Sequence, residues 1–327
     1  MQALARLAGV LGIAVVGLAN ARGAGAADAA YPARPVKIIV SYAAGGINDI
    51  VGRLLAQKMT EDLGQRFFVE DRPGANGNVA SELAARATPD GYTLEIASAG
   101  PHAINVSLYP HLPYDPLKDF VPISLVSWEA SLLIVRPGLP AKTFPDLIAL
   151  LKSAPQPLAY GTAGFGSTTH LGMELLKMKS GTSITPVAYK GASEVTQAVV
   201  TSQVDFAFNG TSTALASVRG GQVRALGVSS LKRSAVLPDV PAIAETLPGF
   251  EALAWHGLLA PAGTPQPVID ILAKEVQKIV REPDIEAHMR DLGITPVGST
   301  PAEFAKFMGD EIRKWAEVVK VSGAKVE

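Results

Sequence analysis

The amino-acid sequence predicts an α/β protein built of two lobes. Short β-branched or apolar runs alternate with segments of helical periodicity, a pattern typical of parallel strands joined by helices. The chain has 327 residues, which is long enough for two medium-sized domains with separate cores. The expected strands are Val36–Ser41, Phe67–Glu70, Tyr92–Ser98, Ser131–Val135, Leu158–Gly161, Val204–Phe208 and Val223–Val228.

The first element along the chain is expected to be an export signal. Arg6 and the amino terminus precede an apolar run over residues 7–19, which is followed by the small residues Ala24, Gly25 and Ala26. Because the run is shorter than the roughly 20 residues that span a bilayer, we expect a signal peptide cleaved after Ala26 rather than a membrane anchor. A lipoprotein needs a cysteine at the cleavage site, and the sequence contains none. A free, soluble exported protein is the expectation.

Composition argues against several classes of function. Without cysteine, the chain has no thiolate metal site and no cysteine nucleophile. The 29 basic and 30 acidic side chains give no overall field that would hold nucleic acid or an anionic membrane. The five histidines show no short metal-ligand spacing. We therefore expect no metal, no other cofactor and no nucleic-acid partner, and any charged ligand must be recognised locally.

The first candidate site is Tyr42–Arg53, which reads YAAGGINDIVGR. A strand leads into Gly45 and Gly46 and then directly into a helix that begins near Asn48. A ligand can approach the main chain at the glycines, and the first N–H groups of the helix point toward it with the positive end of the helix dipole. This geometry suits a carboxylate or a phosphate. Alternatively, the segment is a tight turn capped by Asn48 or Asp49, and it lacks the spacing and the lysine of a nucleotide-binding loop.

The second candidate site is Tyr160–Glu174, YGTAGFGSTTHLGME, which repeats the succession of strand, glycines and helix start. Ser167 and Thr168 offer hydroxyl groups to a ligand or simply cap the helix. His170 lies about one turn inside the helix, where a packed histidine is commoner than a catalyst. If the two lobes face each other, each contributes one anion-binding helix start, and a small ligand would be held between them.

A serine nucleophile is the main alternative at the second candidate site. Nucleophilic catalysis needs a base beside the serine and a third group that orients the base. Ser167 lies in GFGST rather than in a GxSxG elbow, and the sequence shows no partner for it. An exported hydrolase that uses Ser167 stays open as an alternative function.

The remaining segments are expected to be mainly scaffold. Thr143 and Thr300 start helices, and Thr300 forms a capping box with Glu303. Lys190 is either solvated or a cation near a strand end, and Trp255 is expected in the core. Proline-rich stretches around residues 110–122 and 238–265 are expected to carry the passages between lobes. With two crossings, lobe 1 comprises residues 27–126 plus 254–327, and lobe 2 comprises residues 127–253.

Six segments, taken in order, resemble the extracytoplasmic solute receptors of tripartite tricarboxylate transporters, the Bug or TctC family. They cover nearly the whole chain after residue 26 and read YPARPVKIIVSYAAGGINDIVGR, EDRPGANGN, HAINVSLY, YGTAGFGSTTHLGMELLK, AYKGASE and DVPAIAETLPGFEALAWHGLLAPAGTP. The resemblance implies a periplasmic binding protein of the type II-like, two-lobed form, each lobe having a mainly parallel sheet flanked by helices. It also implies that no reaction is catalysed.

The resemblance further implies a ligand, partners and contact residues. The ligand would be a small carboxylate, such as a dicarboxylic amino acid, a citrate-like acid or an aromatic acid, held largely by backbone amides and ordered waters. The partners would be permease subunits of a tripartite transporter, or a membrane sensor; a receptor for another small anion remains an alternative. The candidate ligand-binding residues are Tyr42, Gly45, Gly46, Asn48, Asp49, Ser98, His102, Gly164, Phe165, Gly166, Ser167, Thr168, His170, Phe208 and Asn209.

Overall fold

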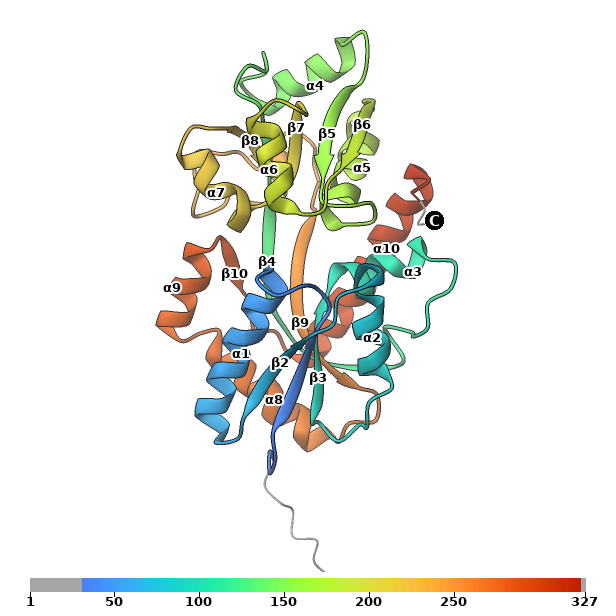
Figure 1. The fold of residues 1–327 in the computed structure, drawn as a ribbon, viewed down its shortest axis with the longest axis vertical. Helices are drawn as coiled ribbons and strands as arrows, with labels where there is room; N and C mark the ends of the chain where they lie inside the picture. Colours follow the sequence, from blue (N-terminus) through green and yellow to red (C-terminus); the bar gives the residue numbers. More distant parts are fainter. Residues whose placement is uncertain (1–30, 325–327) are drawn as a thin grey trace, which may run out of the picture.

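A computed structural model describes residues 31–324 and folds them into two lobes stacked along the long axis of the molecule (Figure 1). The expected signal peptide, residues 1–26, lies outside the described residues. Across residues 31–324, none of the helices combines the length and the apolar character needed to cross a membrane.

Lobe 1 is built around a parallel sheet with strand order β2-β1-β3. Helix α1 packs on this sheet so closely that a Cβ at Gly52 would lie 3.1 Å from Val40 Cγ2 and 3.3 Å from Ile96 Cγ1. The core on this face includes Leu55 and Leu258. The elements of this part of the chain are β1 (Val36–Val40), α1 (Ile47–Leu63), β2 (Phe67–Asp71), η1 (Ala75–Gly77), α2 (Asn78–Ala85), β3 (Thr93–Ser98), η2 (Gly100–Ile104) and α3 (Asn105–Leu108).

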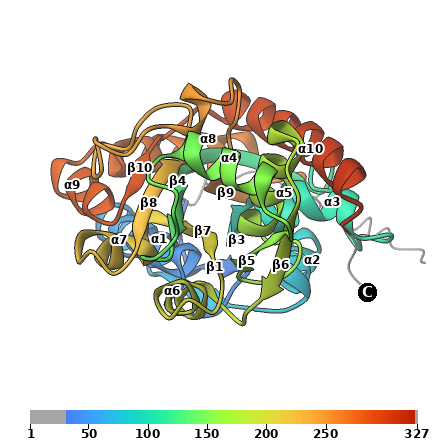
Figure 2. The same ribbon diagram turned by 90° about the horizontal axis from the view of Figure 1, so that it is seen from above.

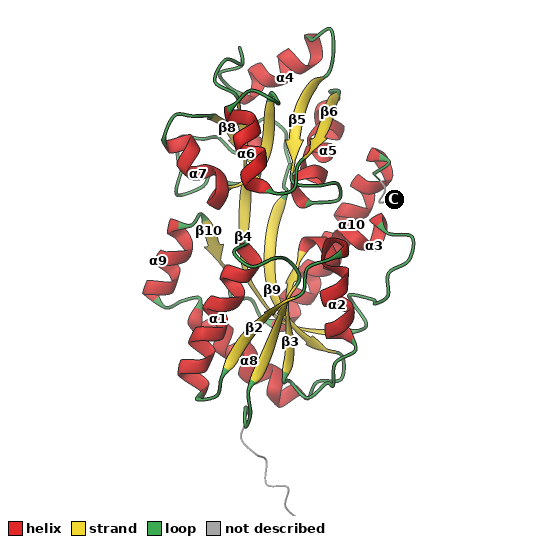
Figure 3. Cartoon of the chain, viewed as in Figure 1, coloured by secondary structure: helices red, strands yellow, loops and turns green. Residues whose placement is uncertain are grey.

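Lobe 2 repeats the same local arrangement with strand order β6-β5-β7, in which both β6 and β7 run parallel to β5. Figure 3 shows the helices of this lobe placed around the strands. The elements are α4 (Phe144–Ser153), β5 (Leu158–Thr162), α5 (Thr168–Ser180), β6 (Ile184–Ala188), α6 (Ala192–Val200), β7 (Phe206–Gly210), α7 (Thr211–Arg219), β8 (Arg224–Val228) and η3 (Ile243–Glu245).

Two strands, β4 (Phe120–Val135) and β9 (Leu253–Pro261), connect the lobes. β4 pairs antiparallel with β9 as far as Ala130 and then with β7 and β8 from Ser131 onward. Antiparallel strands therefore join the parallel core of each lobe, and the sheet is mixed. The predicted division at residues 126/127 and 253/254 falls inside β4 and at the start of β9, and it stays a prediction.

A buried carboxyl group lies where β4 changes partners. Glu129 is 3% exposed, and its Oε1 accepts the N–H of Ser212 at 2.5 Å, at the start of α7. Burial raises the pKa of Glu129 to about 7. This segment between the lobes therefore carries a group whose protonation changes near neutral pH.

After β9 the chain returns to lobe 1 and completes it. The elements are α8 (Gln266–Ile279), α9 (Pro283–Asp291), β10 (Ile294–Pro296), which pairs antiparallel with β4, and α10 (Pro301–Ser322). Seen from above, α8 and α10 lie along one side of the molecule (Figure 2). The expected cap at Thr300 is present, since its hydroxyl accepts the N–H of Glu303 and the Glu303 carboxylate accepts the N–H of Thr300.

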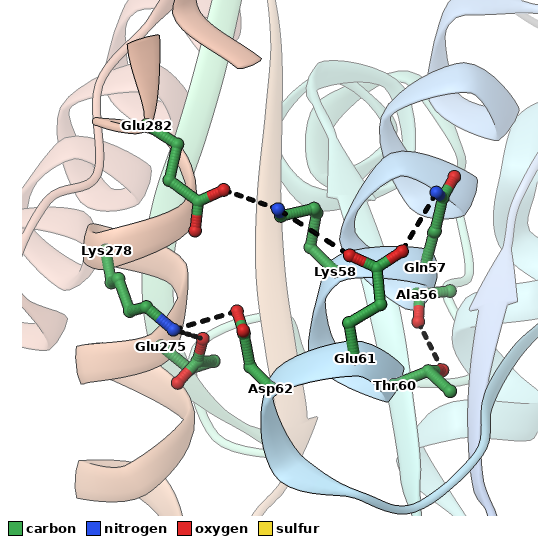
Figure 4. Close-up of polar contacts among 9 residues, drawn as sticks. All are labelled: Ala56, Gln57, Lys58, Thr60, Glu61, Asp62, Glu275, Lys278 and Glu282. Carbon is green, nitrogen blue, oxygen red and sulfur yellow. Dashed lines mark hydrogen bonds and ion pairs between the residues drawn. The ribbon is translucent and has the colours of Figure 1, made fainter. Parts of the chain in front are cut away.

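Ion pairs fix the C-terminal half of α1 (Figure 4). Lys58 Nζ lies 2.5 Å from Glu282 Oε2, and Lys278 Nζ of α8 lies 2.9 Å from Asp62 Oδ2. Ion pairs at the protein surface contribute about 0–1 kcal/mol each, so the effect of these pairs is one of orientation more than of stability. They hold α1 against α8 with its N-terminus directed at lobe 2 (Figure 1).

Most predicted strands are present, with differences in extent. β1, β2, β3, β5 and β8 match the predicted ranges to within a residue or two, and β7 begins at Phe206 rather than Val204. The predicted strand Ser131–Val135 is only the end of β4, which begins at Phe120. The sequence reading missed β6, β9 and β10.

Candidate functional site

A cleft of about 570 Å³ lies between the lobes. Lobe 1 contributes the turns after β1 and β3, the start of α1 and Asn76 of η1 to its walls, lobe 2 contributes the starts of α5 and α6, and β9 contributes the rest. Its lining residues are Tyr42, Ala43, Ala44, Gly45, Gly46, Ile47, Asn48, Asn76, Ser98, Ala99, Gly100, Ala163, Ser167, Thr168, Thr169, Lys190, Gly191, Ala192, Ala254, Trp255 and His256. The cleft therefore brings together both glycine turns that the sequence analysis selected, while ligand contact by their residues stays a prediction.

The first turn is held in shape by Asp49. Gly45 has a φ of 83°, and its N–H donates to Asp49 Oδ2 at 2.8 Å. Asp49 Oδ1 lies 2.6 Å from Arg53 Nε, one helical turn further on. Desolvation raises the pKa of Asp49, but the hydrogen bonds from Arg53 and from the Gly45 N–H outweigh it and hold that pKa below its usual range. Asp49 does not line the cleft; it braces the turn that does.

The start of α1 presents unpaired donors to the cleft. Gly46 is the N-cap and provides no side-chain cap, so the N–H groups of the first turn remain available. Asn48 is 4% exposed, lines the cleft, and its Nδ2 has no hydrogen-bond partner. The positive end of the helix dipole adds to the attraction for an anion at this position.

The second turn uses two glycines with positive φ, Gly164 at 113° and Gly166 at 79°, to lead β5 into α5. Ser167 is the N-cap of α5, and its Oγ accepts the N–H of His170 at 3.2 Å. Ser167, Thr168 and the neighbouring Thr169 line the cleft. A second helix start thus faces the cleft, from the opposite lobe.

The contacts of Ser167 are those of a helix cap. Its Oγ donates to the carbonyl of Gly164 at 2.7 Å and lies within 3.2 Å of the Thr162 and Thr169 hydroxyls. His170 Nδ1 accepts the N–H of Gly166 at 3.2 Å instead of facing Ser167. Desolvation lowers the pKa of His170 and keeps its ring neutral. Among the described residues, no histidine ring or carboxylate contacts Ser167 Oγ, so nothing in this arrangement activates it as a nucleophile.

The two lobes touch at the second turn. Asn76 Nδ2, from lobe 1, donates to the carbonyl of Gly166 in lobe 2 at 3.3 Å and to Asn105 Oδ1 at 2.8 Å. A Cβ at Gly166 would overlap Leu108 Cδ2 of lobe 1, so the absence of a side chain permits this approach. Asn76 belongs to the segment EDRPGANG, which the sequence analysis used only for the resemblance. Only the structure reveals its role, because the hydrogen bond to Gly166 joins residues 90 positions apart in the chain.

Eight residues of the cleft lining from lobe 2 and β9 were not among the predicted contacts, and two of these, Ala163 and Thr169, flank the second turn. Lys190, Gly191 and Ala192 lie where β6 leads into α6, and Lys190 is the cation on the lining. Ala254, Trp255 and His256 lie on β9. No range was predicted for β6, which contains a proline, or for β9, although the sequence analysis did place Lys190 near a strand end. The lining contains no aspartate or glutamate among the described residues.

Several predicted contacts lie off the cleft lining. His102 is fully buried with its Nε2 3.3 Å from Glu95 Oε2, so it packs beneath the site. Phe208 stacks in the core against Phe250, with ring centroids 6.0 Å apart. Asn209 donates to the Ala192 carbonyl at 2.7 Å and to Thr196 Oγ1 at 2.6 Å, which holds the start of α6.

The others belong to the second turn. Gly164 and Gly166 shape that turn without lining the cleft. Phe165 is 56% exposed and packs its ring against His170. Among the described residues, no group of three or more histidine, aspartate or glutamate side chains is arranged to hold a metal ion.

Comparison with known proteins gives consistent matches over most of the chain. The family model described as "Tripartite tricarboxylate transporter family receptor" matches residues 51–324. Protein BugT of Bordetella pertussis is 34% identical over 326 residues, covering 99% of this chain and 99% of that protein.

Two solved structures are similar as well. "R. palustris Rpa4515 with adipate" is 33% identical with a TM-score of 0.82, covering 90% of this chain and 100% of that one. "MatC (Rpa3494) from Rhodopseudomonas palustris with bound malate" is 35% identical with a TM-score of 0.77, covering 88% of this chain and 100% of that one.

Proposed function

Because the chain belongs to the receptor family of the tripartite tricarboxylate transporters, we propose that it is an exported receptor that captures a small carboxylate between its two lobes. One observation carries this proposal: helix starts from opposite lobes meet on a single cleft whose lining has no acidic side chain among the described residues. A carboxylate placed there would be attracted by both helix dipoles and would meet unpaired N–H donors.

Capture would proceed by closure of the lobes around the ligand. In an open form the acid would bind to one lobe, and bending of β4 and β9 would then bring the second helix start onto it. The contact of Asn76 with Gly166 joins the lobes beside the cleft and would form at this stage. Ordered waters can bridge the carboxylate to backbone groups at modest entropic cost. The closed, loaded form would be recognised by a membrane permease, or by a membrane sensor.

The relatives suggest which acids to examine first. Adipate and malate, the molecules named with the two similar structures, are both dicarboxylates. In this chain Lys190 lies at the lobe 2 wall of the cleft, where it offers a cation to a second carboxylate. A dicarboxylate is accordingly the first choice of ligand, with one end at the helix starts and the other near Lys190.

A thermal-shift screen of the purified protein against organic acids and amino acids tests the proposal. A ligand that binds only the folded state raises Tm. At a concentration 100 times its Kd, such a ligand adds about 2.7 kcal/mol to the free energy of unfolding. Phosphate, sulfate and methylphosphonate form the control arm, because a carboxylate receptor should ignore these oxyanions. If no acid raises Tm, and mass spectrometry of the denatured protein finds no retained acid, the proposal fails.

The hydrolase alternative is separated from the receptor by turnover. We expect the acid that binds to be recovered unchanged after incubation with the protein. Consumption of a substrate that Ser167→Ala abolishes, with binding intact, would overturn the receptor proposal.

A further inference from the structure

A row of polar residues crosses the sheet at the floor of the cleft. Ser98 at the end of β3 is directly opposite His256 of β9, and His256 is in turn opposite Ser127 of β4. Residues directly opposite each other in antiparallel strands project from the same face, with Cβ atoms about 4.5–5.5 Å apart. Helix α1 packs on this face at Ile96, two residues before Ser98, so Asn48 at the start of α1 belongs to the same side of the sheet.

Two buried polar atoms of this floor have no hydrogen-bond partner among the described residues. Ser98 Oγ and Asn48 Nδ2 are buried, in residues that are 6% and 4% exposed, and neither makes a hydrogen bond. The nearby Tyr42 hydroxyl donates to Asn76 Oδ1 at 3.3 Å. Burial raises the pKa of Tyr42, and the neighbouring Ser98 side chain lowers it in part, so Ser98 lies beside this hydroxyl. His256 is 1% exposed, and its Nδ1 is paired with Ser127 Oγ at 3.2 Å, which leaves Nε2 without a partner among the described residues.

Unpaired buried polar groups are unfavourable, and two of them, Asn48 Nδ2 and Ser98 Oγ, belong to residues that line the same cleft as His256. All three residues line it. A buried donor or acceptor without a partner is destabilising, so native proteins leave such groups mainly where a ligand, ion or water completes them. The unpaired Asn48 and Ser98 atoms, with His256 beside them on the lining, thus point to a ligand group that reaches the floor.

The chemistry of the floor differs from that of the helix starts. Burial lowers the pKa of His256 to about 4, so its ring is neutral at pH 7 and carries one donor and one acceptor nitrogen. The serine hydroxyl both donates and accepts, and the asparagine amide is uncharged. A second carboxylate has a better position near Lys190 at the lobe 2 wall. An uncharged oxygen that can donate and accept matches the floor best.

We propose that Asn48, Ser98 and His256 form a specificity subsite that recognises a hydroxyl group on the bound acid, so that this receptor selects hydroxycarboxylates over the corresponding unsubstituted acids. The inference rests on the proposed function and adds the ligand class. Asn48 and Ser98 are lobe 1 residues, whereas His256 lies on β9, a strand that joins the lobes. The three side chains meet only at the floor of the cleft.

The test compares acids that differ by a single hydroxyl group. Kd would be measured by calorimetry for L-malate against succinate, 2-hydroxyglutarate against glutarate, and lactate against propionate. We expect at least one hydroxy acid to bind about tenfold or more tightly than its partner, because a site built to bind a hydroxyl is left with unpaired groups by the analogue that lacks it.

Ser98→Ala is the decisive variant. Its Oγ has no partner in the protein, so the Tm without ligand should hardly change, while the preference for the hydroxy acid should fall by about threefold or more. His256→Phe should reduce the same preference, although it also leaves Ser127 unpaired. Ser153→Ala, at the end of α4 and away from the cleft, is the matched control and should leave the preference unchanged.

The outcomes separate the inference from the proposed function. The inference is overturned if unsubstituted acids bind as tightly as their hydroxy partners, if only acids without a hydroxyl bind, or if Ser98→Ala keeps the full preference. In each of these cases the protein still binds a carboxylate, so the proposed function stands. If no acid binds and none is retained, the proposed function fails as well.

Discussion

Adding a single methyl group at Gly166 should weaken ligand binding by obstructing the contact between the lobes. Gly166 has a φ of 79°, and a Cβ there would overlap Leu108 Cδ2 across the lobe boundary. Leu108 is 5% exposed and belongs to the core, so it has little room to retreat. Gly166→Ala therefore introduces two separate penalties.

The magnitudes of these penalties can be worked out separately. A left-handed backbone costs a residue with a Cβ about 1–2 kcal/mol, and this penalty applies whether the lobes are together or apart. Overpacking against Leu108 costs about 1–3 kcal/mol, and it applies only when the lobes touch. Because each 1.4 kcal/mol is tenfold in Kd, Gly166→Ala should weaken binding about 5- to 150-fold.

Gly181→Ala is the matched control, because it changes only the backbone term. Gly181 ends the same helix α5, has a φ of 64°, and its Cβ position has no neighbour within 4 Å. Both variants should lose similar stability in thermal unfolding, but calorimetry with the tightest acid from the screen should show weaker binding for Gly166→Ala alone. A Leu108→Ala background should restore part of that affinity. Equal affinities for the two glycine variants would refute the lobe contact at Gly166 as a feature of the bound state.

Three further predictions concern hydrogen bonds and pH. Asn76→Ala removes the bond to the Gly166 carbonyl and should raise Kd about 2- to 10-fold, as measured by calorimetry; an unchanged Kd would contradict it. The pKa of Asp49 is lowered in the fold, so its carboxylate stabilises the folded protein at pH values above the ordinary pKa of 3.8. Asp49→Asn should therefore lower Tm at pH 7, and this loss of Tm should shrink below pH 3.8. The pKa of Glu129 is raised from 4.5 to about 7, so the free energy of unfolding should fall by about 1–3 kcal/mol over that interval. Glu129→Gln should remove this component in urea titrations, and an unaltered pH dependence would contradict it.

The sequence predicted most strands of the parallel cores but not the strands that join them. β1, β3 and β5 are short apolar runs bounded by turn residues, so propensity and pattern agree. β6 contains Pro186, which argues against a strand, yet β6 lies at the sheet edge where a proline is tolerated. β9 is a mainly apolar segment, LAWHGLLAP, whose pattern does not distinguish a strand from a buried helix.

The first part of β4 was missed for a different reason. It contains Pro122, and its polar residues Ser124, Ser127 and Glu129 are buried rather than exposed. These residues are satisfied by long-range partners such as Ser299 and His256. A partner more than 100 residues away leaves no trace in a local pattern, so the predicted strand began only at Ser131, although β4 starts at Phe120.

The meeting of the two glycine turns follows from strand order, which periodicity does not encode. In open α/β sheets, ligands bind outside the carboxyl ends of strands where the order reverses. Both lobes have the first strand of their parallel unit in the middle, β2-β1-β3 and β6-β5-β7, so each has a reversal beside that strand. The turns after β1 and β5 therefore open at equivalent crevices, and the two connecting strands set these crevices face to face.

Strand order does not decide which side chains reach the ligand. Phe208 and Asn209 end β7, the other strand of the lobe 2 crevice, and so were reasonable candidates from the sequence. The Asn209 amide instead donates hydrogen bonds to Ala192 and Thr196 within lobe 2, and these bonds hold the start of α6. In lobe 1 the equivalent strand end leaves Ser98 unpaired, and His256 joins it from β9. The equivalent strand ends therefore differ: Asn209 of lobe 2 is hydrogen-bonded within the protein, whereas Ser98 of lobe 1 is free to bind a ligand. For this reason we assign specificity to the floor formed by lobe 1 and β9.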